Sequence, residues 1–351
     1  MEKKTIVFVA ISISVALLMA YSVMRWRRER YGKADLSEIE ALNKNLTKVE
    51  VKLFGWVTLS SSSIEAFYAH HDKFTWVSPT WYYITGGGYL IDRGVSRDFI
   101  EKCRSWGVKL IPLVANWEFD RDTIHRILTN PEVRKKAVDS IVKEVLKRGY
   151  DGINIDFENI PYSDRGYLTE FMRLLYEKLH SHGKIVTQAV GLSYVYDHKA
   201  LAEYNDYLIV MAYGYHYSGS GPGPIAPLYW LEDVIRNMLK YVPREKLIIG
   251  VPLYGYDWPK GGRGSAVTYY DAISLAGAYG AKVRFDNASG EAYFRYSSGG
   301  LEHEVWFQVA KSFEVRARLI KAFGLDKIAV WRVGQEDPLI WDIIIRPENN
   351  E

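Results

Sequence analysis

Apolar residues recur in eight short runs along the chain from residue 51 onward, and amphipathic helical patterns separate most of them. The runs are rich in β-branched and aromatic side chains, which is typical of buried β-strands. We therefore predict eight strands, at Val51–Leu59, Thr75–Ile84, Lys109–Trp117, Gly152–Glu158, Ile185–Leu192, Tyr207–Tyr213, Leu247–Tyr254 and Lys327–Val333.

The segments between the runs repeat apolar residues with the period of a helix, most clearly at Pro131–Arg148, Ser163–His182 and Leu228–Val242. The first begins with a proline, and Gly149 and Gly183 fit the ends of the first two. Strands that alternate with helices predict a parallel sheet, and eight of them in roughly 300 residues fit a closed TIM-type (β/α)8 barrel. The alternative, an open doubly wound sheet, would need an early phosphate-binding loop, which the sequence lacks.

The spacing between the seventh and eighth runs is unusually long, at about 70 residues. This stretch combines a helical pattern at Val267–Ala278 with strand-like pieces at Ala281–Asp286, Glu291–Tyr296 and Glu304–Gln308. We predict a small α+β insertion, within residues 257–325, that stands at the top of the barrel and forms one wall of a cleft.

The start of the chain differs from the rest. Thr5–Met24 is a 20-residue apolar run without a charge, which suits a membrane-spanning helix. A cleaved signal peptide is the alternative, although the run is long for one. We predict a membrane anchor or signal segment at residues 1–30, a polar linker or first helix at 31–50, and the barrel at 51–345.

The composition is that of an ordinary globular protein, with 48% hydrophobic and 25% charged residues and a net charge of +3. This small charge gives no indication of nucleic-acid binding. Cys103 is the only cysteine, so internal disulfides and thiolate metal clusters are excluded. His303 begins a zinc-helix-like pattern, but Phe307 occupies the position of the second histidine. We therefore expect no metal and no cofactor.

The fourth predicted strand carries polar residues where a barrel interior is usually apolar. Alternate side chains of a strand share one face. The outward set is Ile153, Ile155 and Phe157, and the inward set is Gly152, Asn154, Asp156 and Glu158. Buried polar side chains are unfavourable unless they form a network, and barrel enzymes keep their active sites at the C-terminal ends of the strands. This pattern indicates a catalytic carboxylate at the barrel mouth; a polar cluster that only closes the mouth is the alternative.

This strand resembles the motif Asp-Gly-x-Asp-x-Asp-x-Glu of the family 18 glycoside hydrolases, since the chain reads Asp151-Gly-Ile-Asn-Ile-Asp-Phe-Glu158. Three further segments resemble later strands of that family in the same order: Met211-Ala-Tyr213, Pro252-Leu-Tyr-Gly255 and Ala329-Val-Trp-Arg-Val-Gly334. The resemblance covers residues 50–345. Asn154 and Asn159 are most similar to the spore-cortex-lytic, peptidoglycan-acting members.

The resemblance implies a retaining hydrolase that cleaves β-linked N-acetylglucosamine glycans, of chitin or peptidoglycan type, by substrate-assisted catalysis. Glu158 would be the general acid, which requires a raised pKa. Asp156 would orient the acetamido group through its N–H, and Tyr213 would hold the acetamido oxygen. Trp331 would form the hydrophobic floor under that sugar.

Other residues are expected near the glycan. The remaining predicted binding residues are Asn154, Met211, Tyr215 and Trp81, and further aromatic candidates are Trp56, Tyr82 and Trp117. Two positions depart from the family pattern, since Asn154 stands where many chitinases have Asp and Gly214 stands where an Asp often follows the Tyr. These departures leave the substrate open more than the reaction class.

Two alternatives to a hydrolase remain open. A lectin-like barrel would bind glycans without cleaving them, although such relatives have usually lost the acid that is present here as Glu158. A membrane-tethered interaction protein is the other. The arginines at 25, 27, 28 and 30 favour a cytoplasmic domain by the positive-inside rule, but a polymeric glycan lies outside the cell. We therefore expect an extracellular domain that is anchored through residues 5–24, or secreted if that segment is cleaved.

Overall fold

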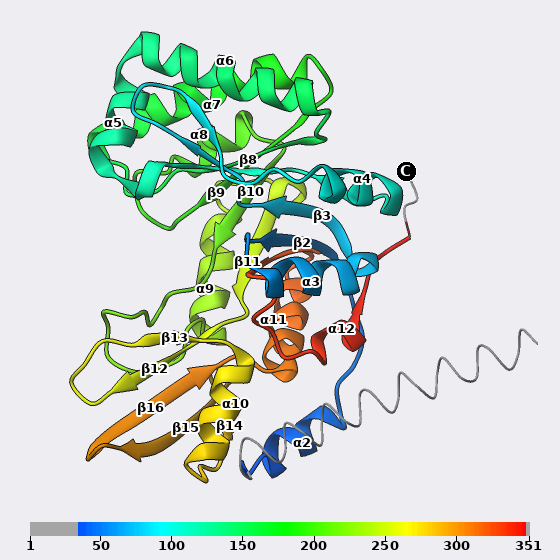
Figure 1. The fold of residues 1–351 in the computed structure, drawn as a ribbon, viewed down its shortest axis with the longest axis vertical. Coiled ribbons are helices and arrows are strands. Elements are labelled where there is room, and N and C mark those ends of the chain that lie inside the picture. The colour runs from blue at the N-terminus through cyan, green and yellow to red at the C-terminus, as the bar shows by residue number, and fades with distance from the viewer. Residues whose placement is uncertain (1–33, 349–351) are drawn as a thin grey trace, which may run out of the picture.

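The computed structural model describes residues 34–348, and Figure 1 shows a barrel with a smaller layer beside it. The barrel strands are β2 (Lys52–Val57), β3 (Phe74–Pro79), β6 (Lys109–Leu110) with its continuation β7 (Leu113–Asn116), β8 (Gly152–Asp156), β9 (Ile185–Val190), β10 (Tyr207–Met211), β11 (Leu247–Pro252) and β17 (Lys327–Trp331). Neighbouring strands pair in parallel, and the last pairs with the first, so the ring is closed. The predicted barrel is confirmed.

Two of the predicted strands are interrupted. The run at 75–84 forms β3 and a separate β4 (Tyr82–Ile84), which pairs with β7 and, antiparallel, with β5 (Leu90–Asp92). The third run breaks at Pro112, whose missing N–H cannot join a ladder. Its first half pairs with β3 and its second half with β8. The second half also pairs with β4, so this segment keeps neighbours on both sides despite the break.

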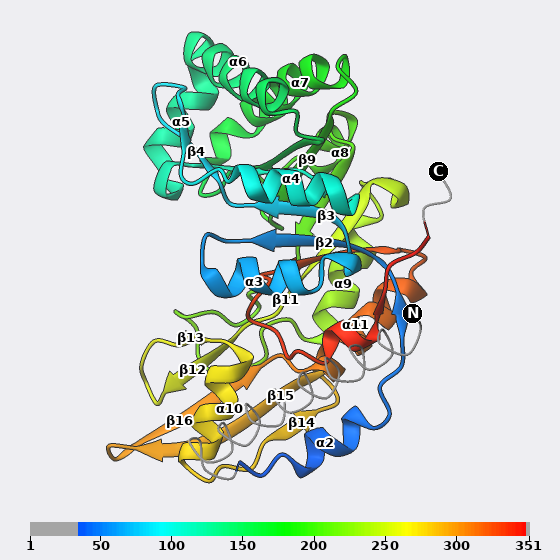
Figure 2. The same ribbon diagram turned by 45° about the vertical axis from the view of Figure 1, so that its right-hand side comes forward.

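Helices cover the outside of the barrel (Figures 1 and 2). They are α3 (Ser61–Ala69), α4 (Arg97–Trp106), α5 (Arg121–Thr129), α6 (Pro131–Arg148), α7 (Arg165–His180), α8 (His198–Glu203), α9 (Leu228–Met238), α11 (Ala310–Ala322) and α12 (Ile340–Ile343), with 3-10 turns at His71–Lys73, Trp117–Phe119, Tyr162–Asp164 and Arg244–Lys246. Helix α6 has the predicted bounds. The Asn130 side chain accepts hydrogen bonds from two N–H groups at its start, and Gly149 ends it with a φ of 67°.

The long spacing before β17 contains the predicted α+β insertion. Its antiparallel sheet consists of β13 (Ser265–Val267), β12 (Gly255–Pro259), β16 (Leu301–Phe307), β15 (Glu291–Ser298) and β14 (Arg284–Asp286), in that order. Helix α10 (Tyr269–Ala278) packs on this sheet and shares its apolar core. Strands β12 and β13 were not among the predicted elements. Figures 1 and 2 show the insertion as a layer beside the barrel.

Alternating side chains of the barrel strands separate an outer core from an inner one. Ile153, Ile155 and Phe157 of the fourth strand segment pack between sheet and helices. The inner core contains Phe54, Trp56, Trp76, Ile111, Leu113, Ala115, Ala189, Ile209, Ile248 and Ala329. The predicted outward face of β8 is thus confirmed, and its polar residues belong to the barrel interior.

The segment that leads to the barrel is a helix rather than an extended linker. Helix α2 (Ser37–Asn43) buries Ile39 in the core of the insertion. Strand β1 (Val49–Glu50) then pairs with β18 (Ile344–Ile345). The apolar run predicted as an anchor, Thr5–Met24, lies outside the described residues. Within residues 34–348, no helix has the length and hydropathy required to cross a bilayer.

Candidate active site

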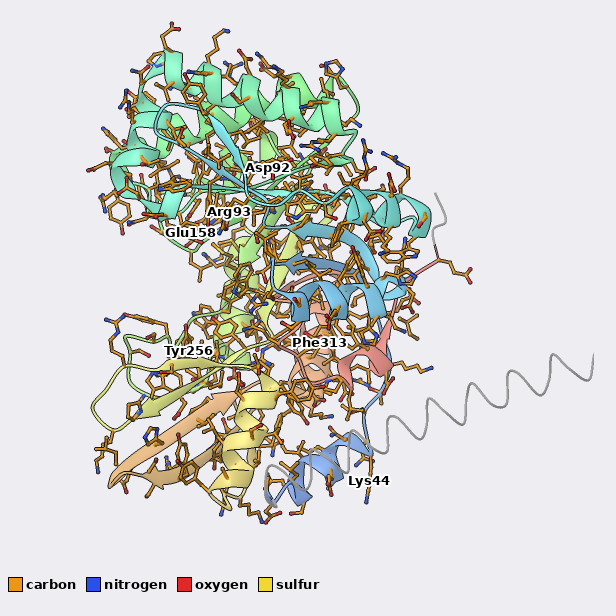
Figure 3. All side chains as sticks on the ribbon, in the orientation of Figure 1. Lys44, Asp92, Arg93, Glu158, Tyr256 and Phe313 are labelled. Atoms are coloured by element: carbon orange, nitrogen blue, oxygen red, sulfur yellow. The ribbon has the colours of Figure 1, made fainter. Side chains whose placement is uncertain are left out.

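A cavity of about 750 Å³ opens at the C-terminal ends of the barrel strands. Its walls are strongly aromatic, with Trp56, Tyr82, Tyr83, Phe119, Tyr213, Trp230 and Trp331 among the lining residues. Its charged lining residues are Asp156, Glu158 and Arg93. Figure 3 shows Glu158 and Arg93 at the edge of the barrel, with Tyr256 of the insertion on the other side of a notch between the barrel and the insertion. Flat apolar walls with a few convergent polar groups fit the binding of sugar rings.

The backbone of Glu158 is fixed from the neighbouring strand. Its N–H donates to Oδ1 of Asn116 (3.0 Å), and its carbonyl accepts from Nδ2 of the same side chain (3.3 Å). Asn116 ends β7 and is fully buried. Asn159 follows with a φ of 57°, a left-handed conformation that asparagine tolerates. Asn116 was not predicted, because its role depends on the pairing of β7 with β8.

The two carboxyl groups interact, with Asp156 buried and Glu158 partly buried. Burial raises the pKa of Asp156 well above its ordinary value, and the charge of Glu158 raises it further. Burial also raises the pKa of Glu158. Among the described residues neither side chain forms a salt bridge, and Oδ1 of Asp156 has no hydrogen-bond partner. The site therefore favours a protonated carboxylic acid, the form that a general acid needs.

Tyr213, Met211 and Trp331 all reach the cavity. Burial raises the pKa of the Tyr213 hydroxyl well above its usual range, and the neighbouring Tyr254, Asp156 and Glu158 act in the same direction. This hydroxyl is thus available as a hydrogen-bond donor. The Trp331 ring meets the ring of Trp56 edge to face, at 5.8 Å between centroids, and so forms part of an apolar surface.

Asn154 lies on β8 two residues before Asp156, which lines the cavity. It is fully buried on the interior face of β8, and neither atom of its amide has a hydrogen-bond partner in the described structure. It does not line the cavity. The direct substrate contact predicted for Asn154 is therefore not made from this position, and any influence would act through Asp156.

Two further predicted contacts need correction. Trp81 is 3% exposed and packs edge to face on Phe99 of α4, in the core between sheet and helices. It faces away from the cavity because it continues the alternation of β3, in which Trp76 packs in the barrel interior and Val77 in the outer core. Tyr215 is exposed outside the cavity and packs on Trp230, which lines the cavity.

The lining residues that were missed include Tyr83, Arg93, Phe119 and Trp230. Tyr83 lies on β4, whose separate alternation brings it inward where Trp81 is turned outward. Arg93 follows β5, a strand too short to predict from its pattern. Among residues 34–348, no group of three or more His, Cys, Asp or Glu side chains could hold a metal ion.

The family model described as "Glycosyl hydrolases family 18" matches residues 55–336. The chain is 30% identical to the cortical fragment-lytic enzyme of Bacillus subtilis (strain 168) over 256 residues, which cover 68% of this chain and 59% of that relative. The chain thus spans less than two thirds of the relative's length.

Solved structures give the same result for the fold. The chitinase from Chromobacterium violaceum ATCC 12472 matches with a TM-score of 0.78 and 28% identity, over 84% of this chain and 98% of that one. The spore cortex-lytic enzyme SleL of Bacillus cereus matches with a TM-score of 0.78 and 24% identity, over 85% of this chain and 74% of that one. With a family model that covers most of the barrel, and motif residues that meet at one cavity, the chain belongs to family 18 of the glycosyl hydrolases.

Proposed function

We propose that this chain is a retaining glycoside hydrolase that cleaves β-linked N-acetylglucosamine-containing glycans. The observation that carries the proposal is Glu158, a carboxyl with a raised pKa that lines the aromatic cavity with Asp156 beside it. The similarity to a cortical fragment-lytic enzyme and to a chitinase agrees with a glycan substrate.

The proposed reaction has two steps. The acetamido carbonyl oxygen of the substrate attacks the anomeric carbon while the glycosidic C–O bond breaks, and Glu158 gives its proton to the departing oxygen. The cyclised sugar carries a positive charge, which Asp156 stabilises while it accepts a hydrogen bond from the acetamido N–H. Water then attacks the same anomeric carbon from the opposite side of the cyclised sugar, and its proton returns to Glu158. The acetamido group re-forms and the anomeric configuration is retained.

The remaining cavity residues position the sugar in this scheme. Tyr213 donates its hydroxyl proton to the acetamido oxygen, which a high pKa permits. Trp331 lies under the apolar face of the same sugar, and Met211 fills the wall beside it. A lectin-like function would not need an acid at this position, so the presence of Glu158 in the cavity, with a pKa raised by burial, favours the hydrolase.

The acid can be tested directly. Glu158→Gln keeps the shape of the side chain and removes its proton, so turnover should fall by about 10²–10⁴-fold while glycan binding survives. Glu101→Gln, on α4 outside the cavity, is the matched control. Near-normal turnover by Glu158→Gln would refute the assignment.

The substrate class needs a second experiment. Chitin oligomers, purified peptidoglycan and glucose oligomers are incubated in parallel, and the products are identified by mass spectrometry. Glucose oligomers lack the acetamido nucleophile, so they should remain intact, and thiazoline mimics of the cyclised sugar should inhibit. Cleavage of glucose oligomers at a comparable rate would exclude substrate assistance.

We also propose that residues 5–24 anchor the enzyme in the membrane with the barrel outside the cell. The support is the uncharged apolar run in the sequence and the extracellular location of the proposed glycans. Membrane fractionation, followed by protease treatment of intact cells, tests both parts. A fully soluble full-length chain, or protection of the barrel from external protease, would contradict them.

A further inference from the structure

We propose that Arg93 binds a carboxylate carried by the glycan, so that the cavity selects an acidic N-acetylated glycan over a neutral one. This inference rests on the proposed function for the glycan itself. It adds a ligand group and a residue that the reaction scheme does not use.

Arg93 is the basic side chain among the residues that line the cavity, and it is exposed. Its guanidinium carbon lies 4.5 Å from the centre of the Tyr83 ring, which is also a lining residue. The Tyr83 ring in turn meets Trp117 edge to face at 5.7 Å. A guanidinium stacked on a ring keeps its N–H groups free at its edge.

The backbone around Arg93 is held on both sides. Its N–H donates to the carbonyl of Trp81 (2.9 Å). Oδ1 of Asp92 accepts from the N–H groups of Gly94 and Val95 (2.8 Å each) and so closes the turn that follows. Oδ2 of Asp92 accepts from Arg148 of α6 (3.4 Å). The stack on Tyr83 is therefore presented by an anchored turn, and the adjacent carboxylate is already engaged elsewhere.

No protein carboxylate neutralises Arg93. Within the described part of the chain its guanidinium forms neither a salt bridge nor a hydrogen bond, whereas Asp92 pairs with Arg148. The cation is thus available to a ligand.

A neutral glycan would offer this cation only hydroxyl and carbonyl acceptors, whereas an anionic glycan would also neutralise its charge. Asp156 and Glu158, when ionised, would repel a carboxylate on the sugar chain, and a cation at the rim offsets that repulsion. The planar fork of arginine matches a carboxylate with two parallel hydrogen bonds. In glycans of the proposed class, such carboxylates occur on the lactyl ether of muramic acid and on peptides attached to it.

Binding to an inactive enzyme tests the proposal without relying on turnover. The full chain in detergent, as Glu158→Gln, is titrated calorimetrically with peptide-free peptidoglycan strands, which bear free lactyl carboxylates. The same strands with their carboxyls converted to methylamides are the neutral match. We expect the carboxylated strands to bind more tightly, and we expect added salt to reduce this preference.

Adding Arg93→Gln should lower affinity for the carboxylated strands by about 10- to 100-fold, and the preference over methylamidated strands should largely disappear. Arg93→Lys should recover only part of it, because lysine lacks the planar fork. Arg97→Gln, at the start of α4 outside the cavity, removes the same charge and should retain the preference. Strands that still carry peptides distinguish lactyl from peptide carboxylates, because their lactyl groups are amides. If these strands bind more tightly than methylamidated strands, and this preference depends on Arg93, the bound carboxylate belongs to the peptide.

Three results would overturn the proposal: equal affinity of the parent for carboxylated and methylamidated strands, an equal loss of affinity for both in Arg93→Gln, or no detectable binding of either. Failure of the proposed function is a separate observation. In that case the unaltered chain would bind the strands without cleaving them, and the dependence of binding on Arg93 would still be measured.

Discussion

Burial and the nearby charge of Glu158 both act against the charged form of Asp156, and burial acts against that of Glu158. A carboxyl whose pKa is higher in the folded protein than in the unfolded chain, where it is about 3.9 for Asp, holds more protons when folded. Stability then decreases as the pH rises from the unfolded pKa through the folded one. The arrangement that suits a general acid thus lowers the stability of the fold at neutral pH.

Replacing Asp156 should expose this effect. Asp156→Asn removes the ionisation, so Tm at pH 7 should rise by about 2 °C or more, although turnover is nearly abolished. Near pH 3 both proteins are neutral at this position and the difference should disappear. Thermal unfolding followed by circular dichroism from pH 3 to 8 measures it, with Asp233→Asn on the surface of α9 as control. A lower Tm for Asp156→Asn at pH 7 would contradict this account.

Asn154 gives a second prediction for the same pair. It lies two residues before Asp156 on the same face of β8, fully buried and without a hydrogen-bond partner in the described structure. Asn154→Asp places a second carboxyl there, and the two should titrate as a coupled unit with one pKa raised. The acid limb of the kcat/KM profile on an N-acetylglucosamine oligomer should therefore move to higher pH. An unchanged profile would show that the two side chains do not interact.

At the scale of single residues, the alternation within one strand predicted which way its side chains point. Contacts that depend on the pairing of two strands were not predicted. The inward positions of Asp156 and Glu158 follow from the period of a single uninterrupted strand. Trp81 was predicted to contact the glycan although it follows the alternation of Val77, which faces the outer core, and Tyr83 was missed because the alternation changes at β4. Asn116 contacts Glu158 only because β7 lies next to β8, which the sequence of either strand alone does not specify.

Among the elements, a buried ion pair joins the insertion to the barrel. Glu291 starts β15 and Arg316 lies on α11, with their charged atoms 2.5 Å apart and at most 1% of either side chain exposed. Glu291 also accepts from the N–H groups of Ile225 and Ala226 (2.8 and 2.7 Å). Arg316 donates to the carbonyl of Ala226. The pair therefore fixes the segment that leads into α9 and its cavity residue Trp230.

Breaking this pair should be costly. Glu291→Gln leaves Arg316 buried without a counter-charge, so the free energy of unfolding should fall by about 3–5 kcal/mol, measured by urea unfolding. Glu302→Gln, which breaks the exposed pair with Lys260, should produce little measurable change. The double variant Glu291→Gln/Arg316→Met should recover much of the loss. A single variant as stable as its parent would show that the pair does not hold the segment.

The alternation of strands and helices was sufficient to predict the barrel, because each element is long enough to show its own period. Shorter elements were not predictable in this way. β12 and β13 have five and three residues, and β12 follows the seventh barrel strand so closely that the two merge into one apolar stretch. β12 pairs with β13 and β16, and the longer strands β15 and β16 of the insertion were predicted.

For the molecule as a whole, α2 makes the insertion dependent on residues that precede the barrel. Ile39 is 2% exposed in the insertion core. Oε1 of Glu38 accepts from the N–H of Phe285 (2.9 Å), and the N–H of Val283 donates to the carbonyl of Asp35 (3.0 Å). The helix thus covers one edge of the insertion, and its polar sequence concealed this role.

Two truncations should therefore differ. Removal of residues 1–33 should leave a chain that folds and retains turnover, because both cores lie within the described residues. Removal of residues 1–45 also takes away α2, and the free energy of unfolding should fall by at least about 1.5–3 kcal/mol from the lost burial of Ile39. Urea unfolding compares the two. Equal stability of the two truncations would mean that α2 does not support the insertion, and aggregation of the shorter deletion would assign the first 33 residues to the fold.

The pairing of β1 with β18 brings the entry and the exit of the barrel together in one two-stranded ladder, with Val49 opposite Ile344 and Glu50 opposite Ile345. This ladder adjoins the amino-terminal end of β2, so it lies at the end of the barrel opposite the cavity, and Figure 1 shows β18 and the last described residues on the far side from the notch. A fluorescent protein or an affinity tag fused after residue 348 would therefore lie on the side away from the cavity. A long polysaccharide bound in the cavity would not contact it.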